Sequence, residues 1–337
     1  MNDRILKYGI VGCGRIAHRH AGEIQKRGIL VGVYDIEREK SELFARKFST
    51  KAYDSFQAML AARKEMDVIV ICTPNGLHAK HSVSALNAGF HVLCEKPMAL
   101  TSEDCKRMVE ASENSHCQLI IVKQNRFNPA VVSVKKALDE GLLGRILSFQ
   151  LSCFWNRGEA YYLDSWHGKL AMDGGTLFTQ FSHFIDILQW YFGVAGEATG
   201  FFSNSLHKGL IEFEDTGVVI LKFPDEIIGT LNYTVNSYSE NMEGSLTIFA
   251  ENGTVKIGGE YLNKIAYQNL KTGTIQSESE QGLVNDYGSY RGSMSNHGQV
   301  YDNLTEVILH GAAVSVSAAD GLRTVEMIER IYRNREF

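Results

Sequence analysis

A glycine-rich segment near the N-terminus is the first place where the sequence carries residues suited to chemistry. Gly12-Cys-Gly14-Arg-Ile-Ala17 follows a short apolar run and opens a stretch with helical spacing. Glycines at these positions allow a tight turn and let backbone N–H groups approach a pyrophosphate at a helix start. Asp35 ends the next apolar run, 21 residues after Gly14, where a carboxylate binds ribose hydroxyls and repels a 2′-phosphate. The pattern predicts a dinucleotide site that favours NAD, while Arg38 leaves NADP as the minor alternative.

Lys96 and His183 are the candidate groups for proton transfer. Lys96 follows the apolar run 91–94, at what would be the carboxyl edge of a buried sheet. An ammonium that loses water there can hydrogen-bond to a substrate hydroxyl or exchange a proton with it. His183 lies four residues after Thr179 in a segment with helical spacing, so both side chains would share one face. Most lysines are solvated and most lone helical histidines are structural, so position alone leaves both roles open.

The elements that must position these groups follow two patterns, which change near residue 122. Residues 1–122 alternate short apolar runs with helical stretches, which predicts a Rossmann domain with a doubly wound parallel sheet. The strand-like runs are residues 8–11, 30–34, 68–72, 91–94 and 119–122. The helical stretches are residues 16–27, 38–48, 55–63, 78–88 and 102–112.

Residues 123–337 are predicted to form an α+β domain on a large, mostly antiparallel open sheet. Residues 229–235 alternate polar and apolar side chains, which places the two kinds on opposite faces. The further strand-like runs are 146–155, 216–223, 244–250 and 254–257, with Asn252-Gly253 as a hairpin turn. Residues 174–192 predict one long helix with Asp173 as its N-cap. Two more helices are predicted over 299–310 and 318–333.

Composition limits the class of protein. With 337 residues, 44% of them hydrophobic, the chain can form two folded domains. A net charge of -5 disfavours a nucleic-acid partner. The sequence has no apolar run near the ~20 residues of a membrane span and no secretory pattern at its start, so we expect a cytoplasmic protein with no membrane partner. The six cysteines form no CxxC pair, so we expect them to be reduced and expect no metal.

Three motifs resemble those of the glucose-fructose oxidoreductase, inositol dehydrogenase and rhizopine catabolism (Gfo/Idh/MocA) family. They are GIVGCGRIA at 9–17, CTPNGLHA at 72–79 and CEKPMAL at 94–100, and the resemblance spans nearly the whole chain. It implies an NAD(P)-dependent dehydrogenase acting on CH–OH groups, a cis Lys96–Pro97 peptide, and Lys96 and His183 as catalytic residues. The dinucleotide-binding residues that it implies are Gly12, Gly14, Arg15, Ile16, Asp35, Thr73, Pro74, Asn75, His78, Glu95, Lys96 and Gln124.

Residues 174–186 resemble the active-site helix of this family, whose histidine acts as acid or base in hydride transfer. The sequence departs from the common family pattern at Thr179, where many members carry Asp. A hydroxyl there either shifts proton transfer toward Lys96 or puts oxidation in doubt. Thr179-Gln180 instead resembles a nucleotide-sugar branch of the family. That branch oxidises the C3 hydroxyl of UDP-N-acetylglucosaminuronate in surface-polysaccharide (lipopolysaccharide) synthesis, although His167 stands where it usually has Arg.

The resemblance therefore implies an enzyme that oxidises a ring hydroxyl of a sugar or nucleotide sugar to a ketone. The substrate-binding residues expected are Lys96, Asn125, Arg126, Trp166, His167, Thr179, Gln180, His183 and Tyr290. Arg291 and His297 are further polar groups in or near the same predicted loops. An inositol or simple-sugar dehydrogenase and a non-catalytic NAD-binding regulator remain as alternatives. Apolar Leu231, Tyr233 and Val235 on one side of the sheet suit association of two sheets, so we expect a homodimer or homotetramer.

Overall fold

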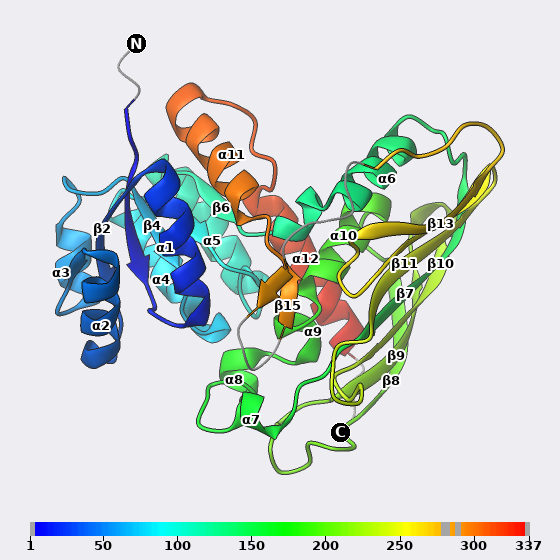
Figure 1. Ribbon diagram of the computed structural model, residues 1–337, viewed down its shortest axis with the longest axis horizontal. Helices are drawn as coiled ribbons and strands as arrows, with labels where there is room; N and C mark the ends of the chain where they lie inside the picture. Colours follow the sequence, from blue (N-terminus) through cyan, green and yellow to red (C-terminus); the bar gives the residue numbers. More distant parts are fainter. Residues whose placement is uncertain (1–3, 278–283, 287–290, 334–337) are drawn as a thin grey trace. The chain divides into compact units, whose positions relative to one another are not determined.

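The computed structural model describes residues 4–277, 284–286 and 291–333, which form two compact units (Figure 1). Unit 1 comprises Met1–Lys123 and His297–Val325, and unit 2 comprises Gln124–Asn296 and Glu326–Phe337. The sequence predicts a boundary at 122 and one continuous second domain. The structure differs because helix α11 (His297–His310) returns to unit 1 and packs on α1 (Arg15–Arg27).

Unit 1 is built on a six-stranded sheet in which every pair of neighbouring strands is parallel. The strand order is β3-β2-β1-β4-β5-β6, with the first half reversed relative to the second, as in dinucleotide-binding folds. The strands are β1 (Lys7–Val11), β2 (Ile29–Tyr34), β3 (Lys51–Ala52), β4 (Val68–Ile71), β5 (His91–Cys94) and β6 (Leu119–Ile121). The predicted Rossmann domain is confirmed, and the two-residue strand β3 is an addition to it.

The helices of unit 1 cover a sheet whose central strands β1 and β4 are almost entirely buried. All four residues of β4 are buried, as expected for a parallel strand between two helical layers. In α1 the buried residues Ala17, Ala21 and Ile24 recur at helical spacing and face the sheet. The other helices are α2 (Arg38–Phe48), α3 (Phe56–Ala61), η1 (Asn75–Leu77), α4 (His78–Asn87) and α5 (Ser102–Ser115).

Unit 2 is built on a seven-stranded sheet, in the order β13-β12-β11-β7-β10-β9-β8. Only β7 and β10 pair in parallel, so the predicted mostly antiparallel sheet is confirmed. The strands are β7 (Ile146–Phe154), β8 (Glu197–Ser203), β9 (Thr216–Lys222), β10 (Ile228–Thr234), β11 (Glu243–Ala250), β12 (Gly253–Gly258) and β13 (Lys264–Leu270). Ala250 pairs with Gly253, so the hairpin turn consists of Glu251 and Asn252, one residue before the predicted pair.

One face of this sheet packs on helices and the other is exposed. Helix α10 (Ser182–Phe192) covers the first face (Figure 1), where Phe181, just before it, contacts Tyr233. Leu231, Tyr233 and Val235 point to this buried face. Our expectation that they form an exposed association surface is therefore wrong, because the sheet register turns them toward α10. The exposed face instead carries the apolar residues Phe201, Val218, Ile220 and Ile228.

The remaining helices of unit 2 include a break that the sequence does not predict. Residues 174–192 form two helices, α9 (Thr176–Thr179) and α10, instead of one. Asp173 ends α8 (Leu170–Asp173) and does not cap α9. The others are η2 (Gln124–Phe127), α6 (Pro129–Asp139), α7 (Glu159–Tyr162) and η3 (Pro224–Glu226). Strands β14 (Val284–Asp286) and β15 (Arg291–Met294) pair antiparallel in a separate two-stranded sheet. Helix α12 (Ala318–Tyr332) begins in unit 1 and ends in unit 2. Within the described ranges, no helix is both long and apolar enough to span a bilayer.

Candidate active site

The turn after β1 requires glycine at its first position. Gly12 has a φ of +92°, a conformation that side chains disfavour. A Cβ atom there would lie 2.6 Å from the carbonyl oxygen of Cys72. The N–H of Gly12 donates to the carbonyl of Tyr34 at 2.8 Å, which ties the turn to β2. Gly12 therefore lets the chain pass close to the neighbouring strand.

Packing against the protein does not require glycine at position 14, where open space leaves room for a ligand. It is the N-cap of α1, its φ is −75°, and a Cβ atom built on it would meet no protein atom within 4 Å. No side chain caps α1, and its first turn has no acidic residue. Backbone N–H groups at such a helix start attract anions. The open space in front of Gly14 and Arg15 therefore fits the diphosphate of a dinucleotide.

Asp35 closes this turn from the end of β2. Its Oδ2 atom accepts the N–H of Cys13 at 2.7 Å. A carboxylate has further acceptor positions, so Asp35 can still receive a ribose hydroxyl. Arg38, which the sequence leaves as a possible partner for a 2′-phosphate, pairs with Glu42 at 2.8 Å and with Asp54 at 3.1 Å. These contacts favour NAD.

The residues after β4 are held by a buried histidine. The ring of His78, at the start of α4, has Nδ1 2.7 Å from the carbonyl oxygen of Pro97 and Nε2 2.8 Å from that of Thr73. Burial lowers the pKa of His78 below its ordinary value. Pro74 and buried Asn75 continue the same turn. His78 thus connects the turn after β4 with the turn after β5 and acts as a support for both.

Lys96 lies in the turn that follows β5. The Lys96–Pro97 peptide is cis, as the resemblance implies, and Lys96 is half-buried. The backbone N–H of Lys96 donates to Oε2 of Glu95 at 3.0 Å. The other carboxylate oxygen, Oε1, lies 2.9 Å from Nε2 of His20 and 3.5 Å from Nε2 of His297. The sequence gives no sign of these two partners, because they lie 75 and 202 positions away.

The side chains of His20, Glu95 and His297 also form the kind of group that binds metals. Their ligand atoms all lie within 4.8 Å of one another, and all three residues are buried. Two imidazoles and one carboxylate are a ligand set that Zn²⁺ accepts. Here the three groups interact with each other directly, so the group has a role without an ion.

In unit 2, His183 is buried in the first turn of α10. Gln180, in the break before this helix, accepts Nε of Arg157 at 2.7 Å and donates to the hydroxyl of Tyr161 at 2.9 Å. Gln180 is thereby fixed between the end of β7 and α7. Arg157 is a candidate site residue that the sequence analysis missed, although its place directly after a strand is a usable signal.

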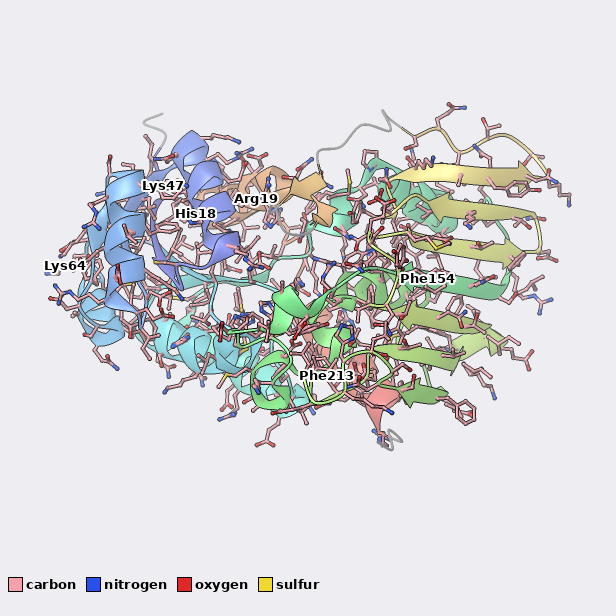
Figure 2. All side chains as sticks on the ribbon, turned by 60° about the horizontal axis from the view of Figure 1, so that its bottom comes forward. His18, Arg19, Lys47, Lys64, Phe154 and Phe213 are labelled. Carbon is pink, nitrogen blue, oxygen red and sulfur yellow. The ribbon has the colours of Figure 1, made fainter. Side chains whose placement is uncertain are left out.

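Trp166 and His167 lie beside the same group. Their rings stack with centroids 3.9 Å apart, and the ring of His167 lies 4.3 Å from that of Tyr161. Tyr161 and Tyr162 pack with Phe213 (labelled in Figure 2) in a small apolar cluster. This aromatic cluster holds the loop before α8 in place.

The three residues of η2 that were predicted to bind ligands have different surroundings. Arg126 is buried and donates Nε and Nη2 to Asp186 at 2.7 and 2.9 Å. The predicted substrate contact of Arg126 is therefore replaced by a buried ion pair with α10. The side-chain amide of Asn125 is buried and has no hydrogen-bond partner within the described residues, so a ligand could satisfy it. Gln124 is also buried.

Tyr290 and the side chain of Arg291 lie outside the described residues. The predicted roles of both as substrate-binding residues stay predictions. His297, from the same stretch of sequence, is instead part of the buried group around Glu95 in unit 1.

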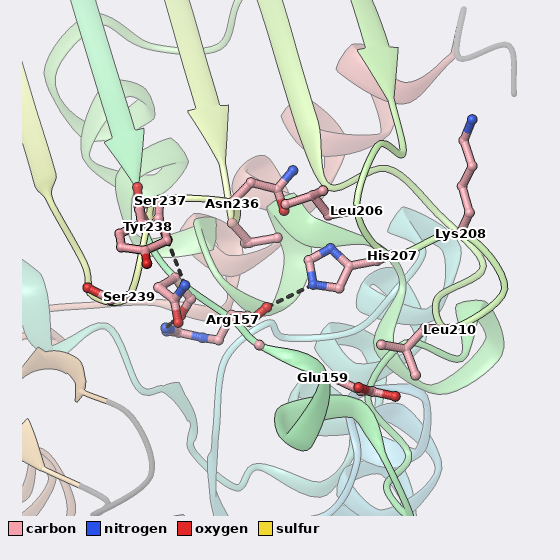
Figure 3. A pocket seen from close by; sticks show the side chains of 13 residues that line it. Arg157, Glu159, Leu206, His207, Lys208, Leu210, Asn236, Ser237, Tyr238 and Ser239 are labelled. Carbon is pink, nitrogen blue, oxygen red and sulfur yellow. Dashed lines mark hydrogen bonds between the residues drawn. The ribbon is translucent and has the colours of Figure 1, made fainter.

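A cavity of about 540 Å³ lies at the end of β7 and β10 in unit 2 (Figure 3). Its lining includes Arg157, Glu159, His207, Asn236 and Tyr238. Nε2 of His207 lies 2.8 Å from the carbonyl oxygen of Arg157, drawn as a dashed line in Figure 3. The lining mixes polar and apolar groups, and its charged residues are Arg157, Lys208 and Glu159. It could receive a hydroxyl-rich or anionic group.

The parallel sheet and its glycine turn define a dinucleotide-binding Rossmann protein, and comparisons with known proteins agree. Residues 6–123 match the model of the oxidoreductase family with an NAD-binding Rossmann fold (GFO_IDH_MocA). Residues 131–256 match the GFO/IDH/MocA C-terminal domain. The chain therefore belongs to the Gfo/Idh/MocA oxidoreductase family, as its motifs predict.

Individual relatives are similar over different lengths. The crystal structure of the WlbA dehydrogenase from Bordetella pertussis, in complex with NADH and UDP-GlcNAcA, is 33% identical with a TM-score of 0.89, covering 98% of this chain and 96% of that one. Levoglucosan dehydrogenase from Pseudarthrobacter phenanthrenivorans is 26% identical over 63% of this chain and 60% of its own. Glucose-6-phosphate 3-dehydrogenase from Bacillus subtilis is 29% identical over 68% and 65%. The chain thus aligns with slightly less than two thirds of each of these two curated relatives.

Proposed function

We propose that this protein oxidises a ring hydroxyl of a sugar or nucleotide sugar to a ketone, with NAD as the hydride acceptor. The observation that carries the proposal is Lys96 in the turn after β5. It lies at the carboxyl edge of the sheet that also carries the open glycine turn, and ligands of such sheets bind at this edge. His183, buried in the first turn of α10, is the second proposed catalytic residue.

Oxidation of an alcohol to a ketone removes a hydride from carbon and a proton from oxygen. Bound NAD would take the hydride. The chain's own residues then have one task, which is to take the proton. As a neutral amine, Lys96 would accept the proton of the reacting hydroxyl. As an ammonium, it would hydrogen-bond to the reacting oxygen and stabilise the charge that develops there, and His183 would accept the proton. Positioned acid–base groups of this kind contribute about 10² to 10⁴-fold in rate.

Within this class, we favour a UDP-N-acetyl-hexuronate oxidised at C3, in surface-polysaccharide synthesis. The support is the similarity over almost the whole chain to a dehydrogenase crystallised with UDP-GlcNAcA, together with the Thr179-Gln180 pair. The cavity beside Arg157 is the proposed place for an anionic part of such a substrate, since a guanidinium recognises carboxylate and phosphate. Asn125, with its buried amide, is a proposed contact for a sugar hydroxyl.

We also propose that the protein forms a homodimer or homotetramer through the exposed face of the unit 2 sheet. Phe201, Val218 and Ile220 lie on neighbouring strands β8 and β9 and are 84%, 49% and 60% exposed. Contiguous exposed apolar side chains of this kind commonly mark an association surface.

The test is a substrate screen that monitors NADH absorbance. The purified protein is incubated with NAD and UDP-GlcNAcA, UDP-GlcNAc, myo-inositol or glucose. We expect turnover with UDP-GlcNAcA, and a higher melting temperature of the NAD complex with UDP alone. Turnover with inositol or glucose only would favour the simple-sugar alternative. NAD binding without turnover of any compound would favour a non-catalytic regulator.

Variants then test the two proposed catalytic residues. Lys96→Met and His183→Asn should keep NAD affinity and lose about 10² to 10⁴-fold in kcat. Lys80→Met, at an exposed position of α4, is the matched control and should behave as the parent. Parental turnover in both catalytic variants would contradict the mechanism.

A further inference from the structure

His20, Glu95 and His297 form a buried cluster next to Lys96 in the chain, which we call the Glu95 cluster. Their residues are 0%, 6% and 1% exposed. Oε1 of Glu95 lies within 2.9 Å of Nε2 of His20 and 3.5 Å of Nε2 of His297. The two imidazole rings meet edge to face, with centroids 5.3 Å apart. The proposed mechanism does not use these two histidines.

The cluster keeps a carboxylate charged in a place where burial works against charge. Burial alone would raise the pKa of Glu95, but the hydrogen bond with His20 and the nearby imidazole of His297 hold it well below its ordinary value. Burying an ionised carboxylate costs several kcal/mol, and apolar residues of similar volume are often as stable. Stability alone therefore does not account for an ionised group at this position.

The hydrogen bonds of the cluster have one consistent direction. The hydroxyl of Tyr301 lies 2.8 Å from Nδ1 of His20. If the tyrosine donates there, Nε2 of His20 carries the ring proton and donates to Glu95. The second oxygen of Glu95 then remains an acceptor for the backbone N–H of Lys96, at 3.0 Å. The chain of bonds runs from α11 through α1 to the residue that carries the proposed catalytic ammonium.

The origin of the two histidines supports a role at this turn. His20 lies on α1, the helix that begins at the open glycine turn. His297 is the first residue of α11, and Tyr301 lies one turn later on the same helix. Both helices belong to unit 1. Helix α11 thus supplies two of the groups that fix the carboxylate preceding Lys96.

We propose that His20 and His297 are positioning residues, which orient Glu95 so that it fixes the main chain of Lys96 for proton transfer. This inference rests on the proposed function only where it is tested by the kinetics of sugar oxidation. Misplacement of a reacting group by about 1 Å can cost on the order of 10²-fold in rate. Loss of either histidine should therefore lower kcat more than it changes KM for the sugar.

The first experiment measures kinetics. His297→Leu removes the imidazole whose Nε2 lies 3.5 Å from Glu95, and His297→Gln offers an amide N–H at a similar reach. We expect kcat to fall at least about tenfold in His297→Leu, with the sugar KM changed by less than about threefold. His297→Gln should recover most of the loss. His310→Gln, at the exposed end of α11, is the matched control and should be silent.

The second experiment needs no substrate. Hydrogen exchange of the Lys96 amide is followed by NMR in protein labelled with ¹⁵N-lysine, in parent and variants. Exchange should be slow in the parent, faster in His297→Leu, and slow again in His297→Gln. This outcome would support the positioning role even if every tested sugar were inactive. Failure of the positioning role can therefore be distinguished from failure of the proposed function.

Three results would overturn the inference. The first is parental kcat in a folded His297→Leu variant, and the second is unchanged exchange of the Lys96 amide. The third is one equivalent of tightly bound zinc whose removal by a chelator abolishes activity, because the cluster would then be a metal site. If the leucine variant does not fold, Tyr301→Phe takes its place. It removes one hydroxyl at constant shape, and it should still speed exchange of the Lys96 amide; unchanged exchange would count against the proposal.

Discussion

The hydroxyl of Thr179 donates a hydrogen bond to the carboxylate of Asp173, six residues earlier in the chain. The same carboxylate accepts the backbone N–H of Gly168 at 2.8 Å. Thr179 lies at the position where many members of the Gfo/Idh/MocA family carry Asp. A carboxylate missing from position 179 is therefore present at the end of α8, where the hydroxyl of Thr179 binds it.

This relationship predicts that two substitutions of Thr179 destabilise the protein for different reasons. Thr179→Val leaves the buried carboxylate with one donor fewer, and should lower the free energy of unfolding by about 1–3 kcal/mol. Thr179→Asp places a second carboxylate beside the first, and like charges repel. It should therefore destabilise the protein at neutral pH and lose this penalty in mild acid.

Urea unfolding at neutral and mildly acidic pH checks both variants. Thr272→Val, at an exposed position after β13, is the control for loss of a hydroxyl. A Thr179→Asp variant that is as stable as the parent and more active would show that position 179 simply prefers a carboxylate.

Arg126 should matter for folding and not for substrate affinity. It forms a buried two-point ion pair with Asp186, and its Nη2 also lies 3.2 Å from Oε1 of Gln189. Breaking a buried pair by removing one partner costs about 3–5 kcal/mol. Arg126→Met should lose about this much in the free energy of unfolding, with little change in sugar KM for the folded fraction. Arg126→Met with Asp186→Leu should recover part of the loss, because no charge is left unpaired. A parental stability with a tenfold higher sugar KM would instead restore the substrate-binding role.

The sequence predicts unit 1 well because short segments of its sequence identify each strand and turn. Strand β4 is apolar throughout and ends at a turn, and the glycine turn follows β1 directly. Parallel strands buried on both faces always leave this pattern. The edge strand β13 has no such mark, since its residues are exposed or half-buried along its whole length. The residue pattern of β13 therefore does not predict a strand.

The break between α9 and α10 is invisible to periodicity for a different reason. Every residue from Thr176 to Gln189 is buried. A helix that is buried on all sides has no alternation of polar and apolar faces. The sequence pattern of one long helix is then the same as that of two short helices. The break lies at Phe181, whose φ of −114° and ψ of 8° depart from helical values.

The sequence predicts only those residues of the candidate site that belong to short, continuous motifs. Gly12, Asp35 and Lys96 lie within recognisable short segments. Their supporting partners do not, since His297 approaches Glu95 from 202 positions away. Only the tertiary structure brings such pairs together, and it also redirects Arg126 from a ligand to Asp186.

Gly12 and Gly14 provide a matched test of the cofactor site. Gly12→Ala forces a side chain onto a positive φ and into the main chain at Cys72, so we expect a destabilised protein. Gly14→Ala meets no protein atom within 4 Å, so the free energy of unfolding without NAD should stay within about 1 kcal/mol of the parent. NAD affinity, measured by calorimetry, should nevertheless fall at least about tenfold, because the methyl group blocks close approach to the backbone. Parental NAD affinity in Gly14→Ala would place the diphosphate elsewhere.

Asp215 should make the stability of unit 2 depend on pH in acid. Burial alone would raise its pKa, but bonds from His207 and from the backbone N–H groups of Leu206 and Ser205 lower it from 3.8 to about 2. A group whose pKa is lower in the folded state stabilises that state above its unfolded pKa, and this contribution disappears as pH falls from about 4 toward 2. The pKa difference corresponds to about 2 kcal/mol.

Asp215→Asn should therefore lose less unfolding free energy than the parent as the pH falls through this range, measured by urea titration at several pH values. Asp225→Asn, at an exposed position, should keep the parental slope. Equal slopes in the parent and Asp215→Asn would mean that other carboxylates cause the acid sensitivity.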